Sequence, residues 1–348
     1  MNLKIRTYPG MERKRLKDIL SAVRKTRVAL LGDLCLDVYW QADMRLSELS
    51  RETPHHPLPI VEERMSLGGG GNVGANLAAL CPAGLAVIGA VGTDWRGREL
   101  KRLLGEQGIG TAGLAEWDSL TTNAYIKPLR AGISGVVYED PRLDFTMHRP
   151  VDSAAEQVIL LALEETVNRG IDVLCVSDQM PFGVVTAAVR KRVVQYAREG
   201  LTVVVDSRDR IGEYPGAILK PNEVEGARAA GMPLPPDGDI AALAQLADRL
   251  ATRNDSSVFM TIGAQGSLYY SCAEVWHLPA HAISGPVDFV GAGDSSLAGF
   301  SLALAAGADP WEAAYLAGLC SEVTIQKLGT TGTATAGEIL QWHSEVAE

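Results

Sequence analysis

Short apolar runs alternate with amphipathic stretches along most of this chain. The runs are rich in Val, Leu and Ile, a pattern typical of strands that are covered on both faces. Because helical patterns separate them, their order predicts an α/β fold with a doubly wound, mostly parallel sheet flanked by helices. The runs are residues 27–33, 85–92, 172–178, 201–207, 217–222 and 257–263.

Residues 9–25 precede the first of these runs and carry a helical pattern. Ile19, Leu20 and Val23 fall on one side of the predicted helix, and charged residues surround them. An amphipathic helix packs its apolar face on the core. We therefore expect this helix to stabilise the fold and not to take part in binding or catalysis.

Two segments, residues 37–66 and 121–149, interrupt the alternation. They lack helical periodicity and contain alternating pieces such as NAYIKPL and LDFTMH. Such pieces predict half-buried strands, so we expect a small β-sheet lid inserted in a single α/β domain that spans residues 1–348. A lid can exclude water from a reaction. Exposed strands also attract other strands, which predicts a homodimer formed through the lid.

Composition narrows the class of protein. The chain has 348 residues, of which 47% are hydrophobic, enough to fill a substantial core. Its formal net charge of −10 argues against a nucleic-acid-binding surface but allows a local site for a small anionic ligand. No apolar run approaches the roughly 20 residues that span a bilayer, and the polar start lacks a signal-peptide core. We expect a cytoplasmic protein without a membrane partner, whose cysteines and histidines form no metal or disulfide pattern.

The stretch DFVGAGDSS, residues 288–296, is the strongest chemical signal. It places Asp294 in a Gly-Ala-Gly turn that opens an apolar helix. Backbone N–H groups at a helix start are unpaired and attract anions, and glycine lets a phosphate approach them closely. Asp294 would then sit beside a bound phosphate and take a proton from a hydroxyl. The alternative is that Asp294 is only a helix N-cap, a position that Asp favours.

The glycine-rich stretch GGGGNVGANLAALC, residues 68–81, has two interpretations. Three of its glycines have GxGxxG spacing, and Asp94 follows at the distance that suits a dinucleotide site. The polar segment 60–67 in front of it, however, makes a poor buried strand. In the second interpretation, a substrate lies against the backbone of Gly68 and Gly69, and Asn72 and Asn76, one helical turn apart, bind its hydroxyls.

Polar residues also follow the predicted strands, where ligands of open α/β sheets collect. Asp33 and Asp37 could accept hydrogen bonds from sugar hydroxyls, or could simply end a strand. Asn222 and Glu225 could hold Mg²⁺ through water, or could cap a surface helix. A third group forms a strand and glycine turn that would equally suit an ordinary hairpin; it comprises Thr261, Gly263 and Gly266.

In chain order, GDLCLD, GGGGNVGAN, KPNEVE, TIGAQG and DFVGAGDSS resemble the motifs of the ribokinase-like (PfkB) family of carbohydrate kinases. The resemblance covers nearly the whole length. It implies transfer of the γ-phosphoryl group of ATP to a sugar hydroxyl on an α/β sheet domain with a β lid. It also implies a need for Mg²⁺ and, through a monovalent cation site, for K⁺.

The resemblance assigns roles residue by residue. Asp294 would be the catalytic base, and the anion hole would be formed by the amides of Gly291, Ala292 and Gly293. The nucleotide would contact Thr261, Gly263, Gly266, Asn222 and Lys220. The sugar would contact Asp37, Gly68, Gly69 and Asn72, with Asp33 beside them. Asn222 and Glu225 would organise Mg²⁺, and Asp288 and the Val290 carbonyl would bind the monovalent cation.

Within the family, the segments GDLCLDVYW and VVVDSRDRIGEYPGAILKPNEVEG most resemble the sequences of the branch that phosphorylates D-glycero-D-manno-heptose 7-phosphate. A phosphorylated sugar needs a cationic clamp, for which the candidates are Arg45, Arg51, Arg64, Arg142, Arg149 and Arg208. A kinase for an unphosphorylated sugar or a nucleoside remains an alternative. So does a non-catalytic sugar- or nucleotide-binding protein on the same fold, and, third, a dehydrogenase.

Overall fold

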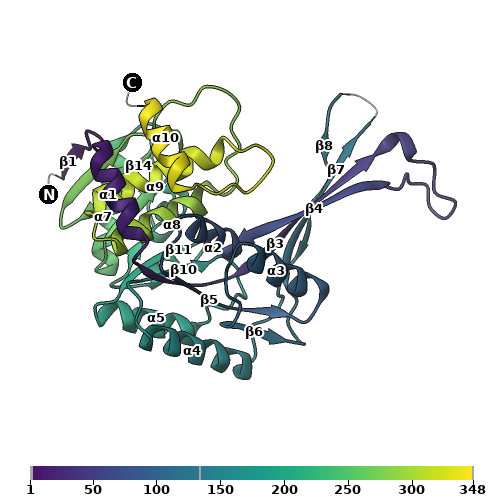
Figure 1. The fold of residues 1–348 in the computed structure, drawn as a ribbon, viewed down its shortest axis with the longest axis horizontal. Coiled ribbons are helices and arrows are strands. Elements are labelled where there is room, and N and C mark those ends of the chain that lie inside the picture. The colour runs from purple at the N-terminus through teal and green to yellow at the C-terminus, as the bar shows by residue number, and fades with distance from the viewer. Residues whose placement is uncertain (1–2, 133–134, 347–348) are drawn as a thin grey trace.

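The structure is a computed structural model that describes residues 3–132 and 135–346. In this part of the chain the main sheet has ten strands (Figure 1). From β13 to β6 all neighbours are parallel, whereas β14 runs antiparallel to both of its neighbours. The strand order is β1 (Lys4–Thr7), β15 (Glu274–Leu278), β14 (Ser267–Ser271), β13 (Val258–Thr261), β12 (Ile218–Leu219), β11 (Thr202–Ser207), β10 (Val173–Asp178), β2 (Arg27–Gly32), β5 (Gly84–Gly92) and β6 (Leu114–Trp117).

Side chains on both faces of the central strands are buried, which explains why these strands are apolar throughout. In β2, Val28 and Leu30 pack into one core cluster, while Ala29 and Leu31 pack into the other. Successive side chains of a strand point to opposite faces, so two helical layers are needed to cover the sheet. The predicted doubly wound α/β fold is confirmed.

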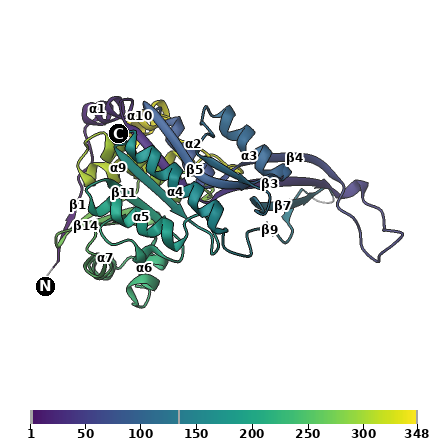
Figure 2. The same cartoon turned by 90° about the horizontal axis from the view of Figure 1, so that it is seen from below.

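Helices cover both faces of the sheet (Figures 1 and 2). One layer consists of α1 (Arg13–Val23), α2 (Gly70–Ala79), α3 (Trp95–Glu106), α8 (Ala292–Ala305), α9 (Pro310–Ile325) and α10 (Ala336–Val346). The other consists of α4 (Ser153–Asn168), α5 (Ala187–Arg198), α6 (Glu223–Ala230) and α7 (Ile240–Asn254). Short 3₁₀ turns occur at Met44–Leu46, Ile211–Glu213 and Gly263–Gln265. No described helix is long and apolar enough to cross a membrane.

The first two elements of the chain differ in how well their structure follows from the sequence. Helix α1 buries Ile19, Leu20 and Val23 as predicted, together with Leu16. Strand β1, which was not predicted, joins the sheet edge through parallel pairing with β15. All its side chains are exposed, so it carries no apolar pattern from which it could be recognised.

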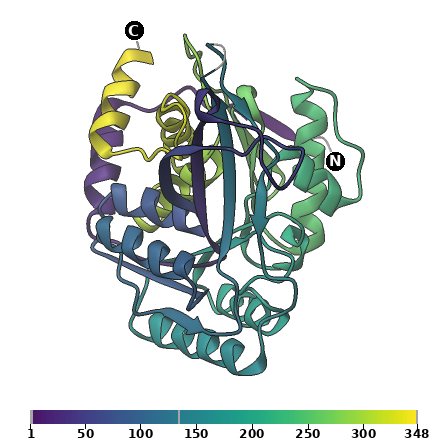
Figure 3. The same cartoon turned by 90° about the vertical axis from the view of Figure 1, so that its right-hand side faces the viewer.

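A second sheet forms the lid and projects from the body (Figures 1 and 2), and this sheet faces the viewer in Figure 3. Strand β3 pairs antiparallel with β4 and parallel with β7, and β7 pairs antiparallel with β8 and β9. These strands are β3 (Leu34–Asp43), β4 (Ile60–Gly69), β7 (Asn123–Ala131), β8 (Tyr138–Glu139) and β9 (Leu143–Phe145). The small β-sheet lid inserted in the α/β fold is therefore present.

Candidate active site

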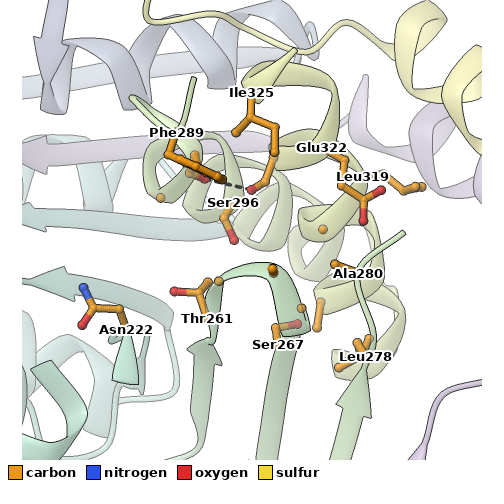
Figure 4. A pocket seen from close by; sticks show the side chains of 18 of the residues that line it. Asn222, Thr261, Ser267, Leu278, Ala280, Phe289, Ser296, Leu319, Glu322 and Ile325 are labelled. Atoms are coloured by element: carbon orange, nitrogen blue, oxygen red, sulfur yellow. Dashed lines mark hydrogen bonds between the residues drawn. The ribbon is translucent and has the colours of Figure 1, made fainter. Parts of the chain in front are cut away.

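A cavity of about 850 Å³ opens where the parallel strands of the main sheet end. Its lining includes Gln179 after β10 and Asp206 at the end of β11. Residues after β12, β13 and β15, the start of α8 and one face of α9 complete it. Figure 4 shows Asn222 and Thr261 on one side of this cavity and Glu322 and Ala280 on another. Ligands of open α/β sheets bind at this edge.

Asp294 lies in the first turn of α8, on the wall of the cavity. The N-cap of the helix is Gly291, with φ 84° and no side-chain cap hydrogen bond, so Asp294 is not the N-cap. The Nδ2 of Asn72 donates to Asp294 Oδ2 over 2.7 Å. A Cβ at Gly291 would lie only 2.8 Å from that same Nδ2, so glycine is needed for α2 and the α8 turn to meet.

The environment of Asp294 raises its pKa to about 7. Burial is the largest cause, because it penalises the charged carboxylate. The hydrogen bond from Asn72 and the charge of Lys220 act in the opposite direction, and the nearby carboxylates of Asp206 and Asp37 raise the pKa further. A carboxylate tuned in this way can accept and return a proton near neutral pH.

The start of α8 offers backbone amides to an anion. The amide of Ala292 donates to the Phe289 carbonyl over 3.2 Å, so a ligand can use it only if this turn opens. Gly293 is exposed at the cavity. The ammonium of Lys220 lies 3.7 Å from the position of a Cβ at Gly293 and therefore adds a cation beside the helix start.

Lys220 is buried and forms an ion pair with Asp206, with 2.6 Å between Nζ and Oδ2. The side-chain amide of Gln179 donates to the other oxygen of Asp206 over 2.8 Å. Asp206 and Gln179 both line the cavity, although neither was predicted as a site residue. Gln179 follows β10 and Asp206 lies at the end of β11, and these two strands are neighbours in the sheet. Their place at the carboxyl ends of strands was the only signal in the sequence.

Asn222 and Glu225 form a capping box at the start of α6. Asn222 Oδ1 accepts from the Glu225 amide over 2.8 Å, and Glu225 Oε2 accepts from the Asn222 amide over 2.9 Å. Burial, followed by the charge of Asp206, raises the pKa of Glu225. Both residues also line the cavity. The remaining oxygen donor of Glu225 and the buried carboxylates nearby suit Mg²⁺ held through water.

Thr261, Gly263 and Gly266 lie in the β13–β14 hairpin, so the hairpin interpretation of this segment is right as local structure. All three residues nevertheless line the cavity. Gly266 has φ 93°, and a Cβ there would lie 2.0 Å from the Leu278 carbonyl oxygen. The turn can therefore hold its shape against β15 only with glycine.

Asp37 lies in β3, opposite Ser66 of β4, at the root of the lid. A Cβ at Gly68 would lie 2.8 Å from Asp37 Oδ2, so Gly68 makes room for this carboxylate. Burial raises the pKa of Asp37, while the charges of Lys127 and Arg142 act against this rise. The carboxylate is therefore largely buried at the root of the lid near two cations, and its charge acts on Asp294.

Asp33 has a different environment, at the point where the chain passes from β2 to β3. It is fully buried and accepts hydrogen bonds from the backbone amides of Gln179, Met180 and Val184 at 2.7–2.9 Å. Burial raises its pKa to about 6. This geometry favours a role in holding the loop after β10, whereas contact with a sugar stays a prediction.

Gly69 joins the lid strand β4 to α2, and Asn76 lies within α2. Gly69 has φ 51°, and a Cβ there would lie 2.9 Å from the Asp33 carbonyl oxygen. Asn76 is buried and donates to both the backbone and the side-chain oxygen of Asn72, at 3.0 and 3.3 Å. Asn76 therefore orients Asn72, and its own amide group is buried away from the cavity.

The dinucleotide interpretation of the glycine-rich stretch does not fit the structure. The strand before it, β4, belongs to the lid and runs antiparallel to β3, whereas a dinucleotide site needs a buried parallel strand. Asp94 caps α3 through a 2.9 Å hydrogen bond from the Gly97 amide and pairs with Arg96.

Asp288 is tied to the segment that follows α9. Its backbone amide donates to the Ile325 carbonyl, and its Oδ2 accepts from the Gly329 amide over 3.0 Å. Its Oδ1 accepts from the Val290 amide. Carboxylate and backbone carbonyl oxygens are the donors that hard cations prefer, so the predicted role of Asp288 and the Val290 carbonyl at a cation stays a prediction. Among the described residues, no cluster of three or more His, Cys, Asp and Glu side chains forms a metal site.

The same segment contacts the root of the lid. The Arg64 guanidinium, from β4, stacks on the Tyr39 ring and donates to the Gly329 carbonyl. The Thr331 hydroxyl donates to the Leu67 carbonyl over 3.1 Å. Strand β4 is therefore hydrogen-bonded to residues 329–331, the segment whose Gly329 amide donates to Asp288.

Arg64, one of the six predicted cationic clamp residues, contacts Tyr39 and Gly329 as described above, and the other five fall into two groups. Arg45, paired with Asp43, and the exposed Arg51 and Arg149 lie away from Asp37 in the described contacts. Arg142 stacks on the Tyr125 ring at 4.1 Å, and the charge of Arg208 also acts on Tyr125. Lys127, which was not predicted, donates to the Tyr39 hydroxyl over 3.2 Å and lies near Asp37.

Comparison with known proteins places this chain in a family. Residues 34–336 match the pfkB family of carbohydrate kinases. The Bifunctional protein HldE of Citrifermentans bemidjiense is 32% identical over 335 residues, covering 93% of this chain and 65% of the relative. The HldE of Caulobacter sp. is 35% identical, with 92% and 64% covered. The chain thus spans less than two thirds of the length of these curated relatives.

Solved structures share the fold at low sequence identity. Ribokinase of Arabidopsis thaliana, solved with ribose and ATP, superposes with a TM-score of 0.70 at 17% identity, covering 92% of this chain and 99% of that one. Phosphofructokinase-2 of Escherichia coli, solved with potassium, gives 0.70 at 18% identity, with 93% and 100% covered. The match to the family and the shared fold agree with the carbohydrate kinase predicted from the sequence, and the chain belongs to the pfkB family of carbohydrate kinases.

Proposed function

We propose that this protein transfers the γ-phosphoryl group of ATP to a hydroxyl of a sugar, with Asp294 as the general base. The observation that carries the proposal is the position of Asp294, between the long cavity and the lid-root carboxylate Asp37, with Asn72 hydrogen-bonded to it. The nucleotide would occupy the cavity, and the sugar would lie between Asp294 and Asp37.

Each neighbouring group has a role in this reaction. Asp294 takes the proton of the attacking hydroxyl, and the amides of Gly291, Ala292 and Gly293 bind the transferring phosphate. Lys220, beside the start of α8, stabilises negative charge there. Thr261 and the hairpin glycines Gly263 and Gly266 line the path of the nucleotide.

Two cations fit the site. Asn222 and Glu225 would hold Mg²⁺ through water, and this ion would neutralise charge on the phosphates of the nucleotide. Asp288 and the Val290 carbonyl would bind K⁺ next to the turn that leads into α8. That cation would keep the turn in the shape from which its amides face the phosphate.

We further propose a sugar that already carries a phosphate, with heptose 7-phosphate as the preferred candidate. Lys127, Arg142 and Arg208 support this, because all three act on Asp37 or Tyr125 at the lid side of the site. Arginine and lysine in such a group suit a phosphate. The sequence resemblance and the similarity to HldE proteins favour the heptose. If these cationic side chains only stabilise the lid and bind no phosphate, the substrate would be an unphosphorylated sugar or a nucleoside.

The lid also supports the proposed homodimer. Ile60 and Val61 of β4 and Tyr138 of β8 are exposed apolar side chains on lid strands. A second copy of the lid would cover them. Because the reaction consumes ATP, we expect it to take place in the cytoplasm.

The test is ADP release from Mg-ATP with K⁺, measured over a panel of sugars, sugar phosphates including heptose 7-phosphate, and nucleosides. Wild-type protein, Asp294→Asn and the exposed control Asp18→Asn are compared. We expect turnover of one phosphorylated sugar, a loss of about 10²- to 10⁴-fold in Asp294→Asn, and no change in the control. Turnover of an unphosphorylated sugar would overturn the substrate assignment alone. Absence of turnover with every acceptor would favour a non-catalytic binding protein.

A further inference from the structure

The end of the cavity away from Lys220 and Asp206 holds a second polar group, formed by His281 and Glu322. His281 follows β15, and Glu322 lies on α9; both line the cavity. Glu322 Oε1 accepts from the backbone amide of His281 over 2.8 Å, and its Oε2 accepts from the ring Nδ1 over 2.9 Å. Helix α10 adds a third donor, because Trp342 Nε1 lies 2.7 Å from Glu322 Oε2.

This arrangement fixes the orientation of the His281 ring. The Glu322 side chain is 7% exposed and faces only N–H donors, as expected of an ionised carboxylate, which can accept but not donate. Nδ1 must therefore carry a hydrogen. Nε2 is then the ring atom left for a ligand, and the described part of the chain offers it no hydrogen-bond partner. The ring keeps a quarter of its surface exposed.

The surroundings show which part of a ligand this end can accept. Apolar side chains of Leu278, Ala280 and Leu319 line the cavity around the pair, and Figure 4 shows them with Glu322 on the side away from Asn222. A buried carboxylate repels a phosphate, so the anionic part of a nucleotide belongs at the α8 start. The flat, uncharged base belongs between the apolar side chains.

We propose that His281 reads the edge of the nucleobase and thereby determines which nucleotide donates the phosphoryl group. The neutral ring, with hydrogen on Nδ1, accepts at Nε2 from the exocyclic amino group of adenine. The protonated ring donates from Nε2 and pairs instead with the exocyclic carbonyl of a 6-oxopurine. Glu322 and Trp342 are positioning residues that hold the ring. The inference rests on the proposed ATP-dependent kinase activity.

The choice of nucleotide should consequently depend on pH. The hydrogen bond to Glu322 raises the pKa of His281 above its usual value, so the protonated form of the ring persists to higher pH. Glu322 and Tyr315 from α9 and Trp342 from α10 face the ring. Tyr315, with its pKa raised to about 12, remains uncharged, and Trp342 does not titrate.

The test compares ATP with ITP, which differs in having a carbonyl at position 6. kcat/KM is measured for both between about pH 6 and about pH 8, where neither base ionises, and the binding of ADP and IDP is measured in parallel. We expect the ATP/ITP ratio to rise with pH by about tenfold, the value of one hydrogen bond gained or lost. The ratio should become independent of pH in His281→Gln, because an amide does not titrate. Trp342→Phe should shift the midpoint of the ratio without abolishing the dependence.

The control His55→Gln changes an exposed histidine of the lid loop and should keep the wild-type profile. A wild-type ratio that does not change with pH, or a dependence that persists in His281→Gln, would overturn the inference. If no acceptor is phosphorylated, the kinase proposal fails, but the ADP/IDP binding ratio still tests His281 by itself.

Discussion

The Nδ2 of Asn72 donates a hydrogen bond to Asp294 across 222 positions of sequence. Asn72 belongs to α2, which begins where the lid strand β4 ends, and Asp294 belongs to the first turn of α8. This contact links the part of the site expected to hold the sugar to the part expected to hold the phosphate. It also controls the protonation of Asp294, because it stabilises the carboxylate against the effect of burial.

The pH dependence of turnover follows from this contact. Activity should rise with pH as Asp294 loses its proton, with a midpoint in kcat/KM near the pKa of about 7. Asn72→Leu removes a hydrogen bond that lowers the pKa, so the midpoint should move upward. The exposed Asn168→Ala, at the end of α4, serves as the control. A midpoint that is the same in Asn72→Leu and wild type would contradict the assignment.

Ionisation of Asp294 at higher pH should lower the free energy of unfolding, although it should increase activity. Its pKa is raised from 3.8 to about 7 on folding, so the folded state holds the proton more tightly than the unfolded state. The stabilisation that protonated Asp294 gives the folded state is fully present below the pKa that Asp294 has in the unfolded chain. It is lost as the pH rises through the pKa that Asp294 has in the folded protein. Asp294→Asn should therefore raise the free energy of unfolding by about 1–3 kcal/mol at about pH 8, and by little at about pH 4. Urea unfolding at the two pH values measures this, and equal effects at both would argue against the raised pKa.

Asp33 and Asp37 should respond differently to the same substitution. Asp33→Asn places an amide group against three backbone N–H donors and should lower the free energy of unfolding by about 1–3 kcal/mol. Its KM for the sugar should stay near wild type. Asp37→Asn should instead raise that KM by about tenfold and cost little stability. An equal rise in KM for Asp33→Asn would show that Asp33 also contacts the sugar.

Gly68→Ala should act through Asp37. The added Cβ would lie 2.8 Å from Asp37 Oδ2, so the carboxylate must move. We expect the KM for the sugar to rise by about tenfold or more, because small misplacements at an active site are costly, with nucleotide affinity unchanged. Gly105→Ala, where a Cβ meets nothing within 4 Å, is the matched control. Steady-state kinetics with each substrate varied in turn would show the difference, and equal KM values in both variants would contradict it.

The sequence predicts those parts of the fold whose cause is local. Strands such as β10 are apolar on both faces, and α1 has one apolar side, so pattern alone is enough. Strand β1 could not be recognised, because only backbone pairing with β15 holds it in the sheet. Asp294 was recognisable because its glycine turn lies within a few residues of it.

The partners of the site residues were harder to predict. Asn72 was expected to bind a ligand, whereas its amide also holds Asp294. Gln179 and Asp206 carried only the signal of their place at strand ends, and Glu322 carried none, since their contacts depend on which strands and helices become neighbours in space. A residue whose role comes from a distant partner leaves no short-range pattern.

The hydrogen bonds from β4 to the segment after α9 connect the lid to the turn that leads into α8. Arg64 and the Leu67 carbonyl are hydrogen-bonded to Gly329 and Thr331, so a movement of the lid on sugar binding would also move residues 329–331. Gly329 in turn holds Asp288, three residues before Gly291. Sugar and nucleotide should therefore bind synergistically, with each lowering the dissociation constant of the other, so that an empty acceptor site leaves the enzyme poorly prepared to hydrolyse ATP.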